Sequence, residues 1–145
     1  MRNVYQHALV AIDLSDAAAI VLAGARALLA PRGRLQVLHV EDSRLTGGFG
    51  VATGLGQRVA DIRARQEVFA RLKPRLRESG VDPSHLEIRF GRPADEIVED
   101  ADHRGCDLIV IGSHGVGGVR ALLGSTANSV VRQAHCDVCT VRIPA

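Results

Sequence analysis

The sequence predicts an α/β fold, an open five-stranded parallel sheet with helices on both faces, of the Rossmann-like type. The prediction rests on two observations. Short apolar runs alternate with segments of helical periodicity along the 145 residues, and most of the links between them are short. The runs at 8–12 and 107–111 are almost continuously apolar, which is typical of strands buried on both faces. Parallel strands in this order need right-handed crossovers, and these place helices on both sides of the sheet.

The first quarter of the chain predicts a strand, a helix and a second strand. The apolar run 8–12 ends at Asp13. The segment 17–29 is rich in alanine and leucine and almost uncharged, so we expect a helix that packs closely on the sheet. The segment 31–33, Pro-Arg-Gly, is expected to stop that helix, and the second strand then covers 34–40.

The next segments predict a long loop and a long helix. The glycine-rich segment 41–56 has little periodicity, and loops of this length are usually functional or disordered. An amphipathic helix is predicted over 57–79, capped by Gly80. Pro74 conflicts with this pattern and is expected to kink or shorten the helix. The expected apolar side comprises Val59, Ile62, Val68, Phe69, Leu72 and Leu76.

The second half of the chain predicts three more strands. The segment 85–90 alternates between apolar and polar residues, so it is placed nearer the sheet edge. A helix over 94–104 follows, with Pro93 suited to its first turn. The most apolar strand, 107–111, is expected to be central, and 137–143 closes the chain as the fifth strand.

Composition and charge limit the possible classes of function. The length fits one domain, 1–145, and 46% hydrophobic residues suffice for a core without a disulfide or metal. Aromatic residues make up only 3%, and the net charge is +2, which disfavours nucleic-acid binding. The sequence shows no signal peptide and no membrane-length apolar run, so we expect a cytoplasmic protein without membrane partners.

The loop 112–126 is the most informative segment, because it joins the apolar strand to a helix predicted over 128–135. A strand, a glycine-rich loop and a helix start form a nest of backbone N–H groups that suits a phosphate. Ser125 and Thr126 stand at expected N-cap positions, and their hydroxyls reach toward the same nest. Neither the P-loop nor the GxGxxG pattern is present. The alternative is a mobile loop capped by Ser125.

Three further residues have a functional and a plain interpretation. Asp13 either accepts a hydrogen bond from an adenine amino group or ribose hydroxyl, or serves as a turn or N-cap aspartate. His114 either donates to a phosphate or acts as a general acid, or is an ordinary surface histidine. His39, inside a predicted strand, is expected to be a buried, hydrogen-bonded core histidine.

The three cysteines form an odd count, consistent with reduced thiols. Cys136 and Cys139 form a CxxC pair that enters a strand, whereas a thioredoxin-like pair opens a helix. Metal binding would require further ligands beside His135. Thiol chemistry and metal binding are therefore disfavoured, no metal site is predicted, and Cys106 is interpreted as a small core residue.

Three separated motifs resemble the signature of the universal stress protein family. They are the loop pattern Gly112-x2-Gly115-x8-Gly124-Ser125, the first strand and turn at 7–15, and the segment 38–40. The resemblance implies a five-stranded parallel α/β sandwich and a cytoplasmic homodimer that pairs through its last strand. It also implies ATP binding without a defined catalytic reaction.

The resemblance further implies which residues contact the nucleotide. Asp13 and Val40 would flank the adenine, and Ala11 stands where ATP-binding members often carry proline. A bound triphosphate would bring Mg²⁺. Ribose and phosphates would be held by Gly112, His114, Gly115, Gly124, Ser125 and Thr126. Three functions stay open: an ATP-binding regulator or sensor in stress response, a nucleotide-free dimer acting through protein–protein interaction, and a slow ATPase or thiol enzyme.

Overall fold

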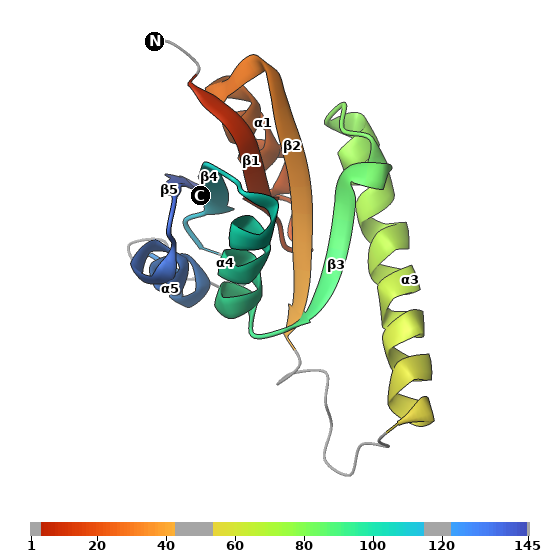
Figure 1. Ribbon diagram of the computed structural model, residues 1–145. Helices are drawn as coiled ribbons and strands as arrows, with labels where there is room; N and C mark the ends of the chain where they lie inside the picture. The colour runs from red at the N-terminus through yellow and green to blue at the C-terminus, as the bar shows by residue number, and fades with distance from the viewer. Residues whose placement is uncertain (1–3, 43–53, 115–122, 145) are drawn as a thin grey trace.

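The fold is a single parallel sheet with the strand order β3-β2-β1-β4-β5, shown in Figure 1. It comes from a computed structural model, which describes residues 4–42, 54–114 and 123–144. The predicted five-stranded parallel α/β fold is confirmed. The strands are β1 (Tyr5–Ala11), β2 (Leu29–Asp42), β3 (Leu86–Gly91), β4 (Leu108–Gly112) and β5 (Asp137–Val141).

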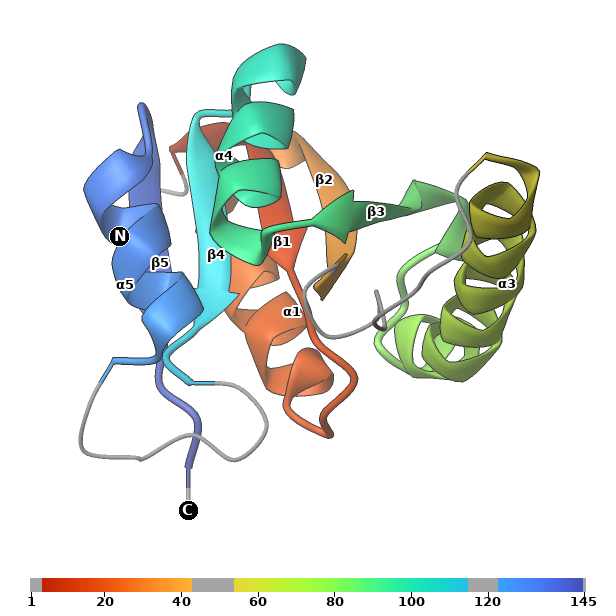
Figure 2. The ribbon, with the colours of Figure 1, turned by 90° about the horizontal axis from the view of Figure 1, so that it is seen from below.

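Helices cover both faces of the sheet. The core on one face joins β1 to buried residues of α1 and α3, and the core on the other face joins β1 to buried residues of α4 and α5. Figure 2 shows α1 and α4 on opposite sides of the strands. Among the described residues, no helix combines the length and apolar character needed to cross a membrane. The helices are α1 (Ala18–Leu28), α3 (Leu55–Glu78), α4 (Pro93–Arg104) and α5 (Ser125–Gln133), with a short 3-10 turn at Pro83–His85.

Strand β1 lies at the centre of the sheet and is buried on both sides. Ala8 and Val10 belong to the core under α1 and α3, whereas Leu9 and Ala11 belong to the core under α4 and α5. The predicted central strand, β4, lies one position away, between β1 and β5. Its apolar run reflects burial by helices on both faces, which any inner strand of a parallel sheet shares.

Strand β2 is longer than predicted. It starts at Leu29, directly after α1, and runs through the segment 31–33 that was expected to be a stop. The register explains this, because Tyr5 pairs with Leu29 while His7 already pairs with Arg34. The intervening residues of β2 lie in an irregular stretch, where a proline removes no ladder hydrogen bond.

Helix α3 departs from the prediction in two respects. It spans 24 residues and continues through Pro74 to Glu78, so the proline does not shorten it. Its predicted apolar side is buried only at three positions of the second half, and the prediction is also wrong for Phe69, which is 36% exposed. Val59 and Ile62 are 50% and 57% exposed, because the first half of α3 extends beyond the core. Val68, Leu72 and Leu76 form the packed half.

The remaining boundaries shift by a few residues. Helix α5 begins at Ser125 instead of residue 128, and β5 ends at Val141. Edge position is confirmed for β3, and Pro93 occupies the first turn of α4 as predicted. Gly105 ends α4 with a φ of 66°, a left-handed conformation that favours glycine.

Candidate functional site

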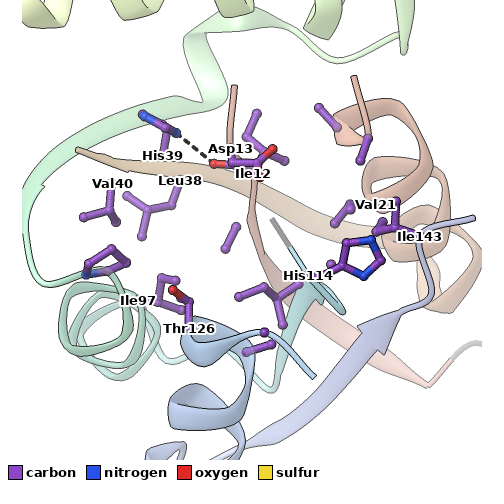
Figure 3. Close-up of a pocket in the computed structure, with 18 of the residues that line it drawn as sticks. Ile12, Asp13, Val21, Leu38, His39, Val40, Ile97, His114, Thr126 and Ile143 are labelled. Carbon is purple, nitrogen blue, oxygen red and sulfur yellow. Dashed lines mark hydrogen bonds between the residues drawn. The ribbon is translucent and has the colours of Figure 1, made fainter. Parts of the chain in front are cut away.

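A cavity of about 440 Å³ opens at the carboxyl ends of β1, β2 and β4. Neighbouring strands β1 and β4 lead into helices on opposite faces, since α1 follows β1 and α5 follows β4. The carboxyl edge at such a divergence is where ligands bind in open parallel sheets. Figure 3 shows side chains from strands and helices of both faces around this cavity.

The turn after β1 carries Asp13 into the cavity wall. The amide of Ile12 still donates to the Leu38 carbonyl at 3.0 Å, and the chain then leaves the sheet. Asp13 Oδ1 accepts from the backbone and hydroxyl of Ser15, at 2.9 Å for the backbone amide. Asp13 is therefore a turn aspartate that also faces the cavity. The N-cap of α1 is Ala17, so the N-cap interpretation of Asp13 is wrong.

Gly124 is required by a close approach of two backbones. Its amide donates to the Ser113 carbonyl at 2.6 Å, which ties the start of α5 to the end of β4. A Cβ atom on Gly124 would lie 3.1 Å from His114 Cα and 3.3 Å from the Ser113 carbonyl oxygen. The φ of Gly124 is −58°, which any residue adopts, so space and not backbone conformation selects glycine here.

The N-terminus of α5 opens on the cavity with amides that have no hydrogen-bond partner among the described residues. The first intrahelical bond runs from Asn128 N to the Gly124 carbonyl at 2.8 Å, so the amides of 125–127 have no intrahelical acceptor. The helix has no side-chain cap, and the prediction that Ser125 caps it is wrong, because α5 starts earlier and Gly124 takes the cap position. The hydroxyls of Ser125 and Thr126 remain at the cavity wall.

The two histidines differ in their surroundings. His114 lines the cavity, and its Nδ1 lies 3.3 Å from Ser113 Oγ. His39 is only 5% exposed and is hydrogen-bonded through both ring nitrogens, to the Ile12 carbonyl at 2.9 Å and to Glu41 Oε1 at 2.7 Å. The prediction of a buried, hydrogen-bonded histidine is confirmed. Sequence reasoning missed that His39 also lines the cavity, as Figure 3 shows.

The apolar part of the wall was also missed, apart from Val40. Leu38 and Val40 of β2 and Ile97 of α4 line one side, as labelled in Figure 3. Apolar residues of strands and helices are expected in a core, and nothing in their spacing distinguishes a cavity wall from a core. Further apolar lining residues are Val21, Pro93, Ile111 and Ile143.

The structure brings the predicted site residues together. All of them that lie within the described residues line this one cavity, whereas Gly115 lies outside the described residues, as do 43–53 and 116–122 of the two predicted loops. The cavity residues from the prediction are Ala11, Asp13, Val40, Gly112, His114, Gly124, Ser125 and Thr126.

The three cysteines lie outside this cavity, and the pKa values of two of them are raised. Cys106 is buried in the core under α4 and α5, as predicted, and burial raises its pKa to about 11. Burial, with smaller contributions from Asp102 and Asp137, also raises the pKa of Cys136. A raised pKa lowers the thiolate fraction on which cysteine reactivity depends. In the described part of the chain, no group of three or more His, Cys, Asp or Glu side chains is placed to hold a metal ion.

Comparison with known proteins gives consistent matches over most of the chain. A family model described as the universal stress protein family matches residues 4–142. Universal stress protein G of Escherichia coli O157:H7 is 34% identical over 138 residues, covering 90% of this chain and 91% of its own. Universal stress protein A homolog 2 of Coxiella burnetii is 35% identical over 112 residues, covering 76% and 75%.

Solved structures share the fold. The universal stress protein UspA from Lactobacillus plantarum superposes with a TM-score of 0.70 at 28% identity, covering 98% of this chain and 99% of its own. A universal stress protein solved in complex with cAMP superposes with a TM-score of 0.61 at 26% identity, covering 95% and 97%.

Proposed function

The chain belongs to the universal stress protein family, and from that premise we propose that it is a regulatory module that binds ATP in the cavity at the carboxyl ends of β1, β2 and β4. One observation carries the proposal. The amides at the start of α5, which have no intrahelical acceptor, and the carboxylate of Asp13 belong to the lining of the same cavity. An anion-binding end and an acceptor for a base or sugar are what a nucleotide requires.

The cavity fits an adenine nucleotide in size and chemistry. Its volume of about 440 Å³ lies within the range of small-molecule sites. Leu38, Val40 and Ile97 supply an apolar wall for a flat base. The amides of 125–127 and the positive end of the α5 dipole favour phosphate oxygens. The close approach at Gly124 places these amides next to the end of β4.

We assign roles within the site accordingly. Asp13 and Val40 flank the adenine, beside Ala11. The triphosphate brings Mg²⁺, which is coordinated by phosphate oxygens and neutralises part of their charge. The ribose and phosphates are held by Gly112, His114, Gly115, Gly124, Ser125 and Thr126. The relative solved with cAMP supports an adenine nucleotide as the ligand class.

We further propose that residues 1–145 act as one domain in a cytoplasmic homodimer that pairs through β5. Strand β5 is an edge of the sheet, and its outer backbone groups are available for a strand of a second copy. At the other edge, β3 is accompanied by α3 (Figure 2). Sedimentation at tens of micromolar tests this, because a weak dimer dissociates on dilution; a monomer throughout would refute the homodimer.

Nucleotide binding is tested directly on the purified protein. We expect ATP to be released on heat denaturation, and added ATP with Mg²⁺ to raise the melting temperature, because a ligand that binds only the folded state stabilises it. If no nucleotide is released and ATP produces no shift, the nucleotide-free dimer that acts through protein–protein interaction is the better description. Phosphate release at a rate above the buffer control would instead indicate an ATPase.

A further inference from the structure

The environment of His39 contains two hydrogen-bond acceptors and places one of them at the candidate site. His39 Nδ1 is 2.9 Å from the Ile12 carbonyl, and His39 Nε2 is 2.7 Å from Glu41 Oε1. The side chains of His39 and Glu41 are 7% and 18% exposed, so water does not replace these partners freely. Figure 3 shows the bond from the His39 ring to Ile12, next to Asp13.

The protonation state of His39 and Glu41 follows from their hydrogen-bond partners. A backbone carbonyl only accepts, and an ionised carboxylate only accepts. A neutral imidazole carries one N–H and satisfies one of the two. Both distances are those of formed hydrogen bonds, and 2.7 Å is typical of a charge-assisted N–H to carboxylate bond. With an ionised Glu41, both contacts are hydrogen bonds only when both ring nitrogens carry a proton.

We propose that His39 is a positioning residue of the candidate site: as an imidazolium paired with Glu41, it donates to the Ile12 carbonyl and thereby fixes the peptide that carries Asp13. This assignment of ligand coupling rests on the proposed function. The Ile12 amide donates to Leu38, the residue before His39, so β2 holds both sides of Ile12. Asp13 follows directly and faces the cavity.

Loss of one proton from the pair frees the Ile12 carbonyl and loosens the peptide before Asp13. A neutral His39 has a single N–H for two acceptors, and the carboxylate of Glu41 is the stronger one. The ring then keeps its bond to Glu41 and gives up the Ile12 carbonyl. A ligand that contacts Asp13 consequently binds the protonated pair better, and its binding is linked to one proton.

Other ionisable groups lie around the pair in the described part of the chain. Asp13 follows β1, and His114 lines the cavity after β4. Arg65 of α3 donates to the carbonyl of Ile88, the β3 residue paired with His39. The residues that α1, its N-cap and α4 contribute to the cavity are not ionisable; they are Ala17, Ala18, Val21, Pro93 and Ile97.

Nuclear magnetic resonance on the nucleotide-free protein tests the assignment without any ligand. In ¹⁵N-labelled wild type near neutral pH, we expect His39 to carry protons on both ring nitrogens. The Asp13 amide resonance should shift as that ring loses a proton at higher pH. Glu41→Gln is the matched variant, because its amide can donate to a neutral ring and both hydrogen bonds survive with one proton fewer. A neutral His39 ring in wild type, or an Asp13 amide that does not follow the ring, would overturn the proposal.

Binding measurements then test the coupling to the ligand. In wild type, the Kd for ATP should rise with pH by up to about tenfold per pH unit once His39 deprotonates, whereas in Glu41→Gln this dependence should be absent. The same ATP serves both proteins, so protonation of the nucleotide cancels in the comparison. Identical pH profiles in the two proteins would overturn the coupling. Failure of wild type to bind ATP at any pH would refute the proposed function, and the resonances of His39 and Asp13 would still decide its positioning role.

Discussion

The two ends of the sheet treat their polar groups differently. At the amino end, Asp107 accepts from the amides of Gln6 and His7, both at 2.9 Å, and closes the start of β1. Arg104 donates to Asp100 at 3.0 Å and also pairs with Glu87. At the carboxyl end, the amides that begin α5 have no intrahelical acceptor and face a cavity. One end is satisfied by its own side chains, and the other leaves donors for a ligand.

His7 is the exception at the amino end, because its Nδ1 is buried and has no hydrogen bond in the described part of the chain. Burial, together with the positive charges of Arg34 and Arg104, lowers the pKa of His7. The lowered pKa favours the neutral His7 ring. Burying this ring costs the free energy of one unpaired acceptor, which is less than that of a buried charge. Under the proposed function, the amino end contributes mainly to stability and the carboxyl end mainly to ligand binding.

The largest expected effect is a loss of ATP affinity caused by a substitution at the carboxyl end of the sheet. Gly124→Val places side-chain atoms against the backbone of Ser113 and His114 and pushes the start of α5 away from β4. We expect the affinity for ATP, measured by isothermal titration calorimetry, to fall by about 100-fold or more, equivalent to about 2.7 kcal/mol.

Gly105→Ala is the control at the amino end. A Cβ atom on Gly105 meets nothing within 4 Å, but its φ of 66° strains any other residue. This variant should lose about 1 kcal/mol of folding free energy and bind ATP as wild type does. Equal ATP affinities for Gly124→Val and wild type would contradict the assignment of the α5 N-terminus to the site.

The second effect is a loss of stability caused by a substitution at the amino end of the sheet. Asp107→Ala removes the acceptor of two backbone amides and should reduce the free energy of unfolding by about 1–2 kcal/mol in urea denaturation, with unchanged ATP affinity. Asp16→Ala is the control, because that carboxylate is fully exposed and its removal should leave stability unchanged.

The contribution of Asp107 should also depend on pH. Burial alone would raise the pKa of Asp107, but the amides of Gln6 and His7 outweigh burial and lower it. A carboxyl with a lowered pKa in the folded state stabilises above its ordinary pKa of about 4 and loses this contribution as the pH falls through the folded value. The stability difference between wild type and Asp107→Ala should therefore shrink at acidic pH; a difference that is constant down to strongly acidic pH would contradict the amide-bonded carboxylate.

The smallest expected effect is a loss of ATP affinity on removal of one hydroxyl from the cavity wall. Thr126→Val keeps the shape of a cavity residue and removes its donor and acceptor. We expect about a fivefold loss of ATP affinity, equivalent to about 1 kcal/mol, and a melting temperature of the unliganded protein close to wild type. If the variant loses stability and keeps its affinity, Thr126 belongs to the fold and not to the site.

Sequence predicted the fold better than the boundaries of its elements. Apolar runs mark β4 and the part of β1 from Ala8 to Ala11, because these residues are buried on both faces of the sheet. The start of β2 was predicted wrongly because of Pro31, since a proline is expected to end a helix and to lie outside a strand. The irregular register that admits it between β1 and β2 cannot be seen in the sequence. The first half of α3 carries Val59 and Ile62 at helical spacing, yet no neighbouring element in the described structure buries them.

The candidate site also contains residues that the sequence predicted and residues that only the fold reveals. Gly124 and Asp13 were found because glycine and aspartate after a strand suggest ligand contacts. Ile97 comes from α4, which is distant in sequence from Asp13 and from Gly124, and its place in the cavity wall follows from tertiary packing alone. The dual bonding of His39 depends on the fold in the same way, since it joins two strands at the point where one leaves the sheet.

Helix α3 has one consequence for cooperativity. Its second half is fixed to the core by Val68, Leu72 and Leu76, whereas Leu55, Val59 and Ile62 in its first half are at least half exposed. Tertiary contacts, more than intrinsic propensity, stabilise helices in proteins. The turns that carry Leu55, Val59 and Ile62 are therefore expected to open locally before the rest of α3, which is held by its packed residues and by the bond from Arg65 to the Ile88 carbonyl of β3. Backbone amides near residue 60 will exchange with solvent well before those near residue 72, within one continuous helix.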